Sequence, residues 1–278
     1  MTIIVTGMSN KLSMKKKTVL QVLFILVMAL ILLRLPLPSF VPVANEYEAL
    51  LYKRLMNGTL IVVFSLGMIQ FTGLRAWLLP GMKRIRKYAA IWPAFLLILI
   101  WFYLTSPSFK EITAGPGLLM FLVLVTFLKA SAEELLFRGL CQHWFLRDGN
   151  KPRKAIFLSS LLFSLLHIAN FFSHGDWVSL ANQLIFAFFT GLIFGVIMYT
   201  TGNILVPCIL HTLVNIPSGL AVFAVKQVEE TETTDAVAGP VDGLLSILMF
   251  CVVFSPLIIT GLYYFFNKRW VPVADSGD

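Results

Sequence analysis

Four charged residues lie inside one long apolar stretch, in the segment Lys129–Arg138, whose sequence is KASAEELLFR. An ionisable group at the centre of a bilayer costs about 2.5–3.5 kcal/mol on insertion scales, so such groups indicate function. Glu134 and Arg138 are four residues apart and share a helical face, which predicts an ion pair. Glu133 points about 100° away around the same helix, and that pair does not account for it. Lys129, four residues earlier, is an alternative partner for Glu133, and this pairing would make the whole set structural.

Two other apolar stretches each contain a histidine. Phe163 and His167 are four residues apart, as are His211 and Asn215, so each pair shares one helical face. A single histidine in a membrane helix is often only a hydrogen-bonded structural residue. Two of the four histidines lie within apolar stretches, and one of them has asparagine as its neighbour on the face, which favours a functional role. Carboxylate and imidazole groups in apolar surroundings serve either acid–base catalysis or proton relays. The other two histidines, His143 and His174, lie at the ends of apolar stretches and are assigned no role.

The elements that carry these residues are expected to be membrane-spanning helices. The chain has 278 residues, of which 58% are hydrophobic and 13% charged, whereas soluble domains have about 25% charged residues. A helix needs about 20 apolar residues to cross the bilayer, and lipid offers no partner to unpaired backbone groups. The expected fold is therefore all-α, a polytopic transmembrane helical bundle of about eight spans. The expected spans are 18–34, 55–74, 88–105, 117–146, 155–172, 180–200, 204–225 and 244–266.

The basic residues predict the orientation of the chain rather than a nucleic-acid partner. The net charge is +8, and lysine and arginine flank apolar spans on the cytoplasmic side. The segments assigned to the cytoplasm hold fifteen of these residues and the opposite side holds five, so both termini are expected in the cytoplasm, and in a prokaryote the membrane would be the plasma membrane. The fifteen are Lys11, Lys15, Lys16, Lys17, Arg75, Lys83, Arg84, Arg86, Lys87, Arg147, Lys151, Arg153, Lys154, Lys268 and Arg269; the five are Arg34, Lys53, Arg54, Lys110 and Lys226.

Three regions are expected along the chain. Residues 1–116 would form N-terminal transmembrane helices, residues 117–225 the core helices that carry the charged and histidine residues, and residues 226–278 an acidic outer loop with a C-terminal transmembrane helix. The apolar run 19–33 follows three lysines as in a signal sequence, but no small-residue cleavage site follows it, so it is interpreted as an uncleaved first span. The three cysteines lie in apolar runs and show no disulfide or metal-binding spacing.

The order of the motifs resembles the CPBP family of intramembrane proteases. This family includes type II CAAX prenyl endopeptidases and bacteriocin-processing or self-immunity proteins. The matching patterns are Glu133-Glu134-x-x-x-Arg138, Phe163-x-x-x-His167 and His211-x-x-x-Asn215, each in a separate apolar stretch. Each motif alone is weak, but the three in this order are specific. His-Glu-x-x-His, Gly-x-Ser-Gly, Tyr-Asp and Gly-x-Gly-Asp, which mark other intramembrane proteases, are absent from the sequence.

The resemblance implies roles for the motif residues. It implies that Glu133 is the general base, that His167 shares the catalytic water, and that His211 and Asn215 stabilise the oxyanion. Glu134 and Arg138 would hold the helix and its charges, and Phe163 would pack against the site. The implied activity is that of an endopeptidase in the membrane, acting on a membrane-associated, lipidated or exported peptide with a water activated by glutamate and histidine. The expected partners are a peptide or protein substrate and the lipid bilayer.

Alternatives to this mechanism remain open at the level of sequence. One glutamate and two histidines can bind zinc with one open position, so Glu133, His167 and His211 would be the ligands if a zinc ion is present. Zinc ligands usually include a close pair on one helix, whereas these three come from separate spans, so a metal-free mechanism is equally open. A non-catalytic bacteriocin immunity or membrane scaffold protein is the alternative function. A transporter is a third possibility, because buried charges also form proton relays.

Overall fold

A computed structural model describes residues 20–32, 35–36, 46–73, 91–107, 114–171, 175–224 and 240–267. Within these residues the chain forms helices and no strands, which confirms an all-α membrane protein. The helices are Leu20–Leu32, α2 (Glu46–Thr72), α4 (Ile91–Thr105), α5 (Pro116–Glu134), η2 (Leu135–Gln142), α6 (His143–Arg147), α7 (Pro152–Leu166), η3 (His167–Asn170), α9 (Trp177–Thr201), α10 (Leu205–Ala224), α11 (Pro240–Val253) and α12 (Ser255–Phe266). Lys15–Lys17, the basic residues of 75–87 and most of the acidic segment 226–242 lie outside the described residues.

The number of membrane spans stays a prediction. By length and composition, three described helices are able to cross a membrane: Leu51–Thr72, Pro152–Asn170 and Trp177–Thr201. The bent pair α11 and α12 makes a fourth if it is one span, and three further apolar helices are shorter. The continuous helix of α5, η2 and α6 carries the four charged residues of the segment Lys129–Arg138. The charged residues lower the mean hydropathy of this helix, so it is not among the three, although it is long enough to cross a membrane.

Two elements differ from the expected spans. α2 begins at Glu46 instead of near residue 55, so Lys53 and Arg54 belong to a helix and not to an outer loop. The polar first turns of α2 contain glutamate, alanine, leucine, lysine and arginine, which favour helix although hydropathy does not detect them. The expected span 244–266 breaks at Phe254, and α11 and α12 meet at 62°. Proline near the start of α12 cannot donate the hydrogen bond that would continue α11.

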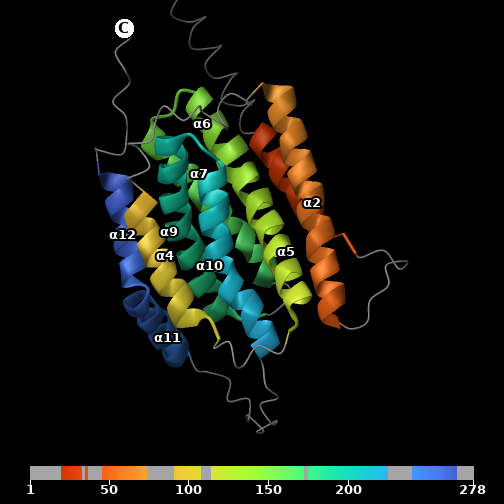
Figure 1. Ribbon diagram of the computed structural model, residues 1–278. Helices are drawn as coiled ribbons and strands as arrows, with labels where there is room; N and C mark the ends of the chain where they lie inside the picture. The colour runs from red at the N-terminus through yellow and green to blue at the C-terminus, as the bar shows by residue number, and fades with distance from the viewer. Residues whose placement is uncertain are drawn as a thin grey trace, which may run out of the picture.

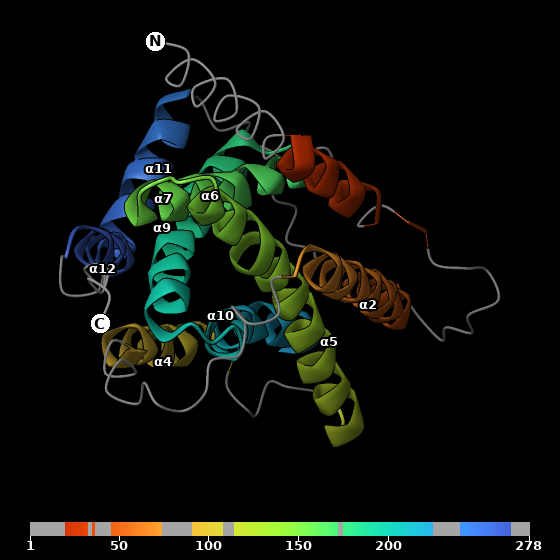
Figure 2. The ribbon, with the colours of Figure 1, turned by 90° about the horizontal axis from the view of Figure 1, so that it is seen from above.

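The helices form a bundle with α9 in its interior (Figures 1 and 2). α9 packs against α7 and α12, and α10 packs against α5 and α4. α5 also packs along α2, which lies at one side of the bundle (Figure 2). In the most apolar stretch of α9, 67% of the residues are buried, whereas 28% are buried in the corresponding stretch of α2. α9 therefore lies at the centre of the bundle and contacts α7, α10, η2 and η3, which carry residues of the site.

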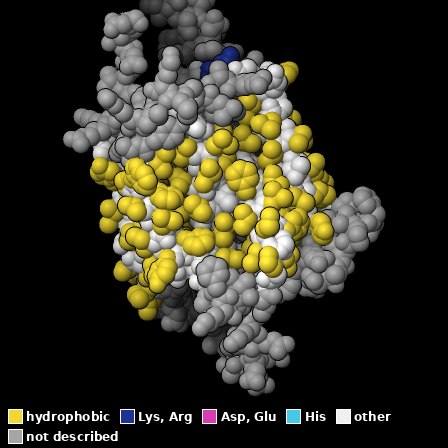
Figure 3. Space-filling view, in the orientation of Figure 1, with side chains coloured by type: hydrophobic (Ala, Val, Ile, Leu, Met, Phe, Trp, Pro, Cys, Tyr) yellow, Lys and Arg dark blue, Asp and Glu magenta, His cyan; other side chains and the backbone are white. Residues whose placement is uncertain are grey.

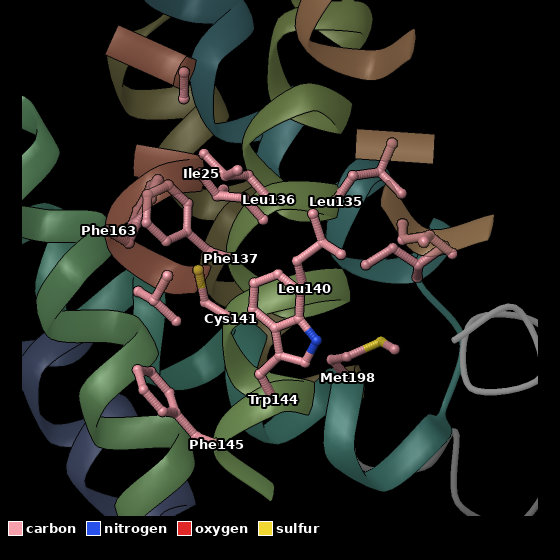
Figure 4. Packing of buried hydrophobic residues seen from close by; sticks show 14 of the residues in the cluster. Ile25, Leu135, Leu136, Phe137, Leu140, Cys141, Trp144, Phe145, Phe163 and Met198 are labelled. Atoms are coloured by element: carbon pink, nitrogen blue, oxygen red, sulfur yellow. The ribbon is translucent and has the colours of Figure 1, made fainter. Parts of the chain in front are cut away.

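Hydrophobic side chains cover both the interior and the outer surface. Around η2, Phe137 packs against Phe163 of α7, and Leu140 and Trp144 belong to the same buried cluster (Figure 4). On the outside, Phe71, Tyr103 and Met120 are 87%, 83% and 75% exposed, and hydrophobic side chains cover the middle of the face in Figure 3. Such a surface is unfavourable in water but suits a bilayer, where helices are held together by close packing and buried polar contacts.

Candidate active site

The long helix that begins at Pro116 changes its hydrogen-bond pattern at the two glutamates. It is α-helical as far as Glu134, becomes a π-helix in η2, and returns to α-helix in α6. π-helical turns are rare and occur frequently at functional sites. The wider turns begin directly after Glu134 and contain Arg138. The charged segment noted in the sequence therefore coincides with the irregular part of the helix.

Glu134 and Arg138 form a fully buried ion pair. The Arg138 Nη1 donates to Glu134 Oε1 at 3.1 Å, and both side chains are 0% exposed. The Nη2 of Arg138 donates to the carbonyl oxygen of Gly191 in α9 at 3.2 Å. The guanidinium carbon also lies 4.6 Å from the centre of the Phe163 ring of α7. The predicted ion pair is thus confirmed, and it joins the π-helix to two neighbouring helices.

A second buried polar contact lies one step further along the same helices. Gln142 Nε2 donates to the carbonyl oxygen of Gly195 at 3.0 Å, four residues beyond the Arg138–Gly191 contact on both helices. A Cβ atom on Gly195 would lie 2.9 Å from Ile156 Cγ2, and one on Gly191 would lie 3.1 Å from a side-chain carbon of α7. The glycines thus permit close helix approach, as small residues spaced by four do in membranes. Sequence reasoning missed this contact, although the spacing of four was a usable signal.

His211 of α10 lies between the two glutamates. Its Nδ1 is 2.8 Å from Glu134 Oε1, and its Nε2 is 3.6 Å from Glu133 Oε2. A carboxylate accepts hydrogen bonds, so Nδ1 carries the proton that is donated to Glu134 and Nε2 faces Glu133. A separation of 3.6 Å is too long for a direct hydrogen bond and is compatible with a bridging water. Glu134 therefore orients the imidazole toward the second carboxylate.

Glu133 is the carboxylate that reaches the cavity. Its side chain is 13% exposed, whereas that of Glu134 is 0% exposed. Lys129 Nζ lies 3.9 Å from Glu133 Oε1, but the lysine side chain is 47% exposed. A long ion pair with an exposed lysine contributes little to stability. The predicted Lys129 contact is present, yet it leaves the Glu133 carboxylate accessible. His167 and His211 also interact electrostatically with Glu133.

His167 lies where α7 ends. The chain tightens there into the short 3₁₀ helix η3. The His167 Nδ1 is 2.9 Å from the carbonyl oxygen of Phe163, so Nδ1 is the donor and Nε2 remains an acceptor. The Phe163 ring contacts both histidines edge to face, with centroids 5.1 Å from His167 and 5.6 Å from His211. Phe163 thus packs between the two imidazoles and limits their rotation.

Asn215 lies one turn beyond His211 on α10. Two residues further along, Pro217 interrupts the backbone hydrogen bonds of α10, because proline has no N–H to donate. The carbonyl oxygen of Val214 accepts a hydrogen bond from the indole of Trp101 in α4 at 3.4 Å, and that of Asn215 accepts one from the Ser218 hydroxyl at 2.8 Å. These contacts fix the backbone that carries the Asn215 amide.

One cavity brings the candidate residues together. Its volume is about 470 Å³, and it lies among α2, α5, α7, α9 and α10. Glu133, Phe163, His167, His211 and Asn215 all line it, while Glu134 and Arg138 lie behind its wall. The sequence indicated that these residues lie at membrane depth, but not that they meet. Of the other histidines, His143 is not among the lining residues and His174 lies outside the described residues.

The expected zinc ligands do not form a metal-binding group within the described residues. No three histidine, cysteine, aspartate or glutamate side chains in that part of the chain are arranged to hold a metal ion. Glu133 and His211 face each other, and His167 faces the same cavity. The geometry described above suits a water held among hydrogen-bonding side chains.

Comparison with known families gives one match. Residues 115–217 match the family model described as "Rce1-like: Type II CAAX prenyl endopeptidase Rce1-like". This segment is therefore similar to the CAAX-type endopeptidases. The resemblance predicted from the three motifs is thereby confirmed. A search of curated proteins found no matching sequence.

The segment that matches the CAAX-type endopeptidase model contains the whole candidate site. All seven residues of the three motifs lie within 115–217, and so do the glycines that contact Arg138 and Gln142. α2, which closes one side of the cavity, lies outside the match. The match overlaps the expected core 117–225, while the boundaries of the three regions stay a prediction. The family is one of membrane endopeptidases, which sets the class of activity to be tested.

Proposed function

We propose that the chain is an intramembrane endopeptidase that hydrolyses a peptide bond of a membrane-associated, lipidated or exported peptide. The observation that carries the proposal is the meeting of Glu133, His167 and His211, from three separate helices, in one cavity. Polar groups at this depth are costly, and convergence in a cavity is the arrangement that makes them useful. The family match to residues 115–217 supports the same class of reaction.

The catalytic water is placed between Glu133 and His167. The Nε2 of His167 is free to accept a hydrogen bond from water because Nδ1 donates to Phe163. Glu133 takes a proton from this water as the oxygen bonds to the peptide carbonyl carbon, and general-base catalysis of this kind contributes about 10²–10⁴ in rate. When the carbon–nitrogen bond breaks, the proton held by Glu133 passes to the leaving amine. Water is consumed, and a carboxylic acid and an amine are formed.

The oxyanion is placed on the α10 side of the cavity. The Asn215 amide is one hydrogen-bond donor, and protonated His211 is the second through Nε2. The Nδ1 of His211 contacts Glu134 Oε1, so Glu134 offsets the positive charge of the imidazolium. A charged donor gives a stronger hydrogen bond than a neutral one. Glu134 and Arg138 act through His211 and are positioning residues in this scheme.

Substrates can be identified by comparing membranes that contain the wild type or Glu133→Gln. Quantitative proteomics of peptide termini should show new termini only with the wild type. Asp148→Asn is the matched control, because Asp148 is a carboxylate outside the cavity in the turn after α6. Its termini should equal those of the wild type. Identical termini for wild type and Glu133→Gln would favour the non-catalytic immunity or scaffold alternative.

Metal dependence is tested on the same preparations. Exhaustive chelation should leave cleavage intact, and metal analysis should find no stoichiometric zinc. If chelation abolished cleavage and zinc alone restored it, Glu133, His167 and His211 would be reassigned as zinc ligands.

A further inference from the structure

The cavity has a second polar region that the proposed chemistry does not use. Lys53 and Arg54 of α2 line it together with Lys129 of α5, and Glu133 is the one acidic side chain among its described lining residues. The second polar region thus carries three cations, while the one carboxylate of the described lining is the proposed base. Lys53 and Arg54 lie outside the segment 115–217 that matches the protease family.

The packing of α2 on α5 sets how far this region lies from Glu133. The helices run in the same direction, with Tyr52 and Phe121 5.5 Å apart between ring centroids and Gly58 beside the backbone of Lys129. Arg54 therefore lies level with about residue 125 of α5. Eight residues of helix separate that level from Glu133, which corresponds to about 12 Å along the axis.

None of the ion pairs among the side chains that the structure describes includes Lys53 or Arg54. Lys129 contacts Glu133 only at 3.9 Å. Adjacent lysine and arginine side chains at a cavity in an apolar bundle attract an anion. The arginine fork matches a carboxylate with two parallel hydrogen bonds.

We propose that Lys53 and Arg54, assisted by Lys129, form a subsite that binds a carboxylate of the peptide substrate. An extended peptide rises about 3.3 Å per residue, so 12 Å corresponds to about four residues from the scissile bond. The carboxylate belongs either to an acidic side chain or to the C-terminus of the peptide. The placement relative to the scissile bond rests on the proposed function, while the binding of the carboxylate itself does not.

Binding to Glu133→Gln in nanodiscs of neutral phosphatidylcholine tests the subsite without cleavage. The probes are three fluorescent apolar hexapeptides: one with a free C-terminal carboxylate, its C-terminal amide, and an amide with an internal glutamate. Anisotropy gives each Kd. At least one acidic probe should bind about tenfold more tightly than the neutral amide, as expected for a hydrogen bond to a charged group. The preferred probe distinguishes the terminal carboxylate from the side chain.

The double substitution Lys53→Gln and Arg54→Gln should remove this preference and leave the Kd of the neutral amide unchanged. The matched control is Arg147→Gln with Lys151→Gln, which removes the same charges at exposed positions that do not line the cavity. Lys129 is left intact because it also contacts Glu133. Circular dichroism and size-exclusion chromatography verify that each variant is folded.

Three outcomes would overturn the subsite. They are equal binding of acidic and neutral probes, a preference that survives in the α2 double variant, and a preference lost equally in the control. If the α2 variant changes only the binding of anionic phosphatidylglycerol, the cations form a lipid headgroup site instead. The readout is binding, so absence of cleavage by the wild type would refute the proposed function and leave this result standing.

Discussion

Replacing Arg138 with methionine, an unbranched apolar side chain that lacks the guanidinium group, should strongly destabilise the bundle. The change removes the 3.1 Å ion pair with Glu134, the 3.2 Å hydrogen bond to Gly191 and the contact with the Phe163 ring. Removing one partner of a buried ion pair costs about 3–5 kcal/mol, because the other charge is left buried without compensation. For a domain of this size, each kcal/mol lowers Tm by about 2–4 °C, so Tm should fall by about 6–20 °C.

Thermal unfolding in detergent, followed by intrinsic fluorescence, measures this effect. Arg147→Met is the control, because Arg147 is exposed, and its free energy of unfolding should change by less than about 0.5 kcal/mol. The double variant Glu134→Gln and Arg138→Met should be at least about 1 kcal/mol more stable than the sum of the two single changes predicts. A Tm for Arg138→Met within 2 °C of the wild type, or strict additivity in the double variant, would refute this account of the pair.

Three further predictions follow from the packing, the site and the orientation. Gly195→Ala should lower the free energy of unfolding by about 1–3 kcal/mol, because the added Cβ would lie 2.9 Å from Ile156 Cγ2. Gly67→Ala is the control and should not destabilise the protein, because nothing lies within 4 Å of its added Cβ. Equal melting temperatures of the two variants would contradict this packing. Asn215→Ala should lower kcat by about 10²–10³ through loss of an oxyanion donor, and an unchanged kcat would remove Asn215 from that role. In a background without native cysteines, an impermeant thiol reagent on intact cells should label a cysteine in 229–235 but not one in 83–87, and the reverse pattern would invert the predicted orientation.

The sequence predicted the features that depend on local spacing. Four-residue spacing identified the Glu134–Arg138 pair and the Lys129–Glu133 contact, because residues four apart are neighbours on any helix. Hydropathy identified the apolar helices, because lipid requires their backbone groups to be paired internally. The three motifs identified the family, because each one lies within the segment that matches it.

Features that depend on packing between helices were beyond the sequence. His211 contacts Glu134, which is 77 positions away in the sequence, and it also faces Glu133; no periodicity reports such a separation. The π-helix after Glu134 contains Arg138 and Gln142, whose side chains donate to Gly191 and Gly195 of α9, and these contacts join distant parts of the sequence. The early start of α2 was missed because hydropathy does not register its polar first turns.

The rate of peptide cleavage by purified Glu133→Gln tests the central claim most directly. The measurement uses wild type, Glu133→Gln and Asp148→Asn in liposomes, with a substrate identified from the terminal proteomics, under single-turnover conditions so that product release does not contribute. Glutamine keeps the size and shape of the side chain but cannot accept the proton of water, so the rate should fall by about 10²–10⁴. Asp148→Asn should cleave at the wild-type rate. If folded Glu133→Gln cleaves as fast as the wild type, Glu133 is not the base, and the proposed mechanism is contradicted.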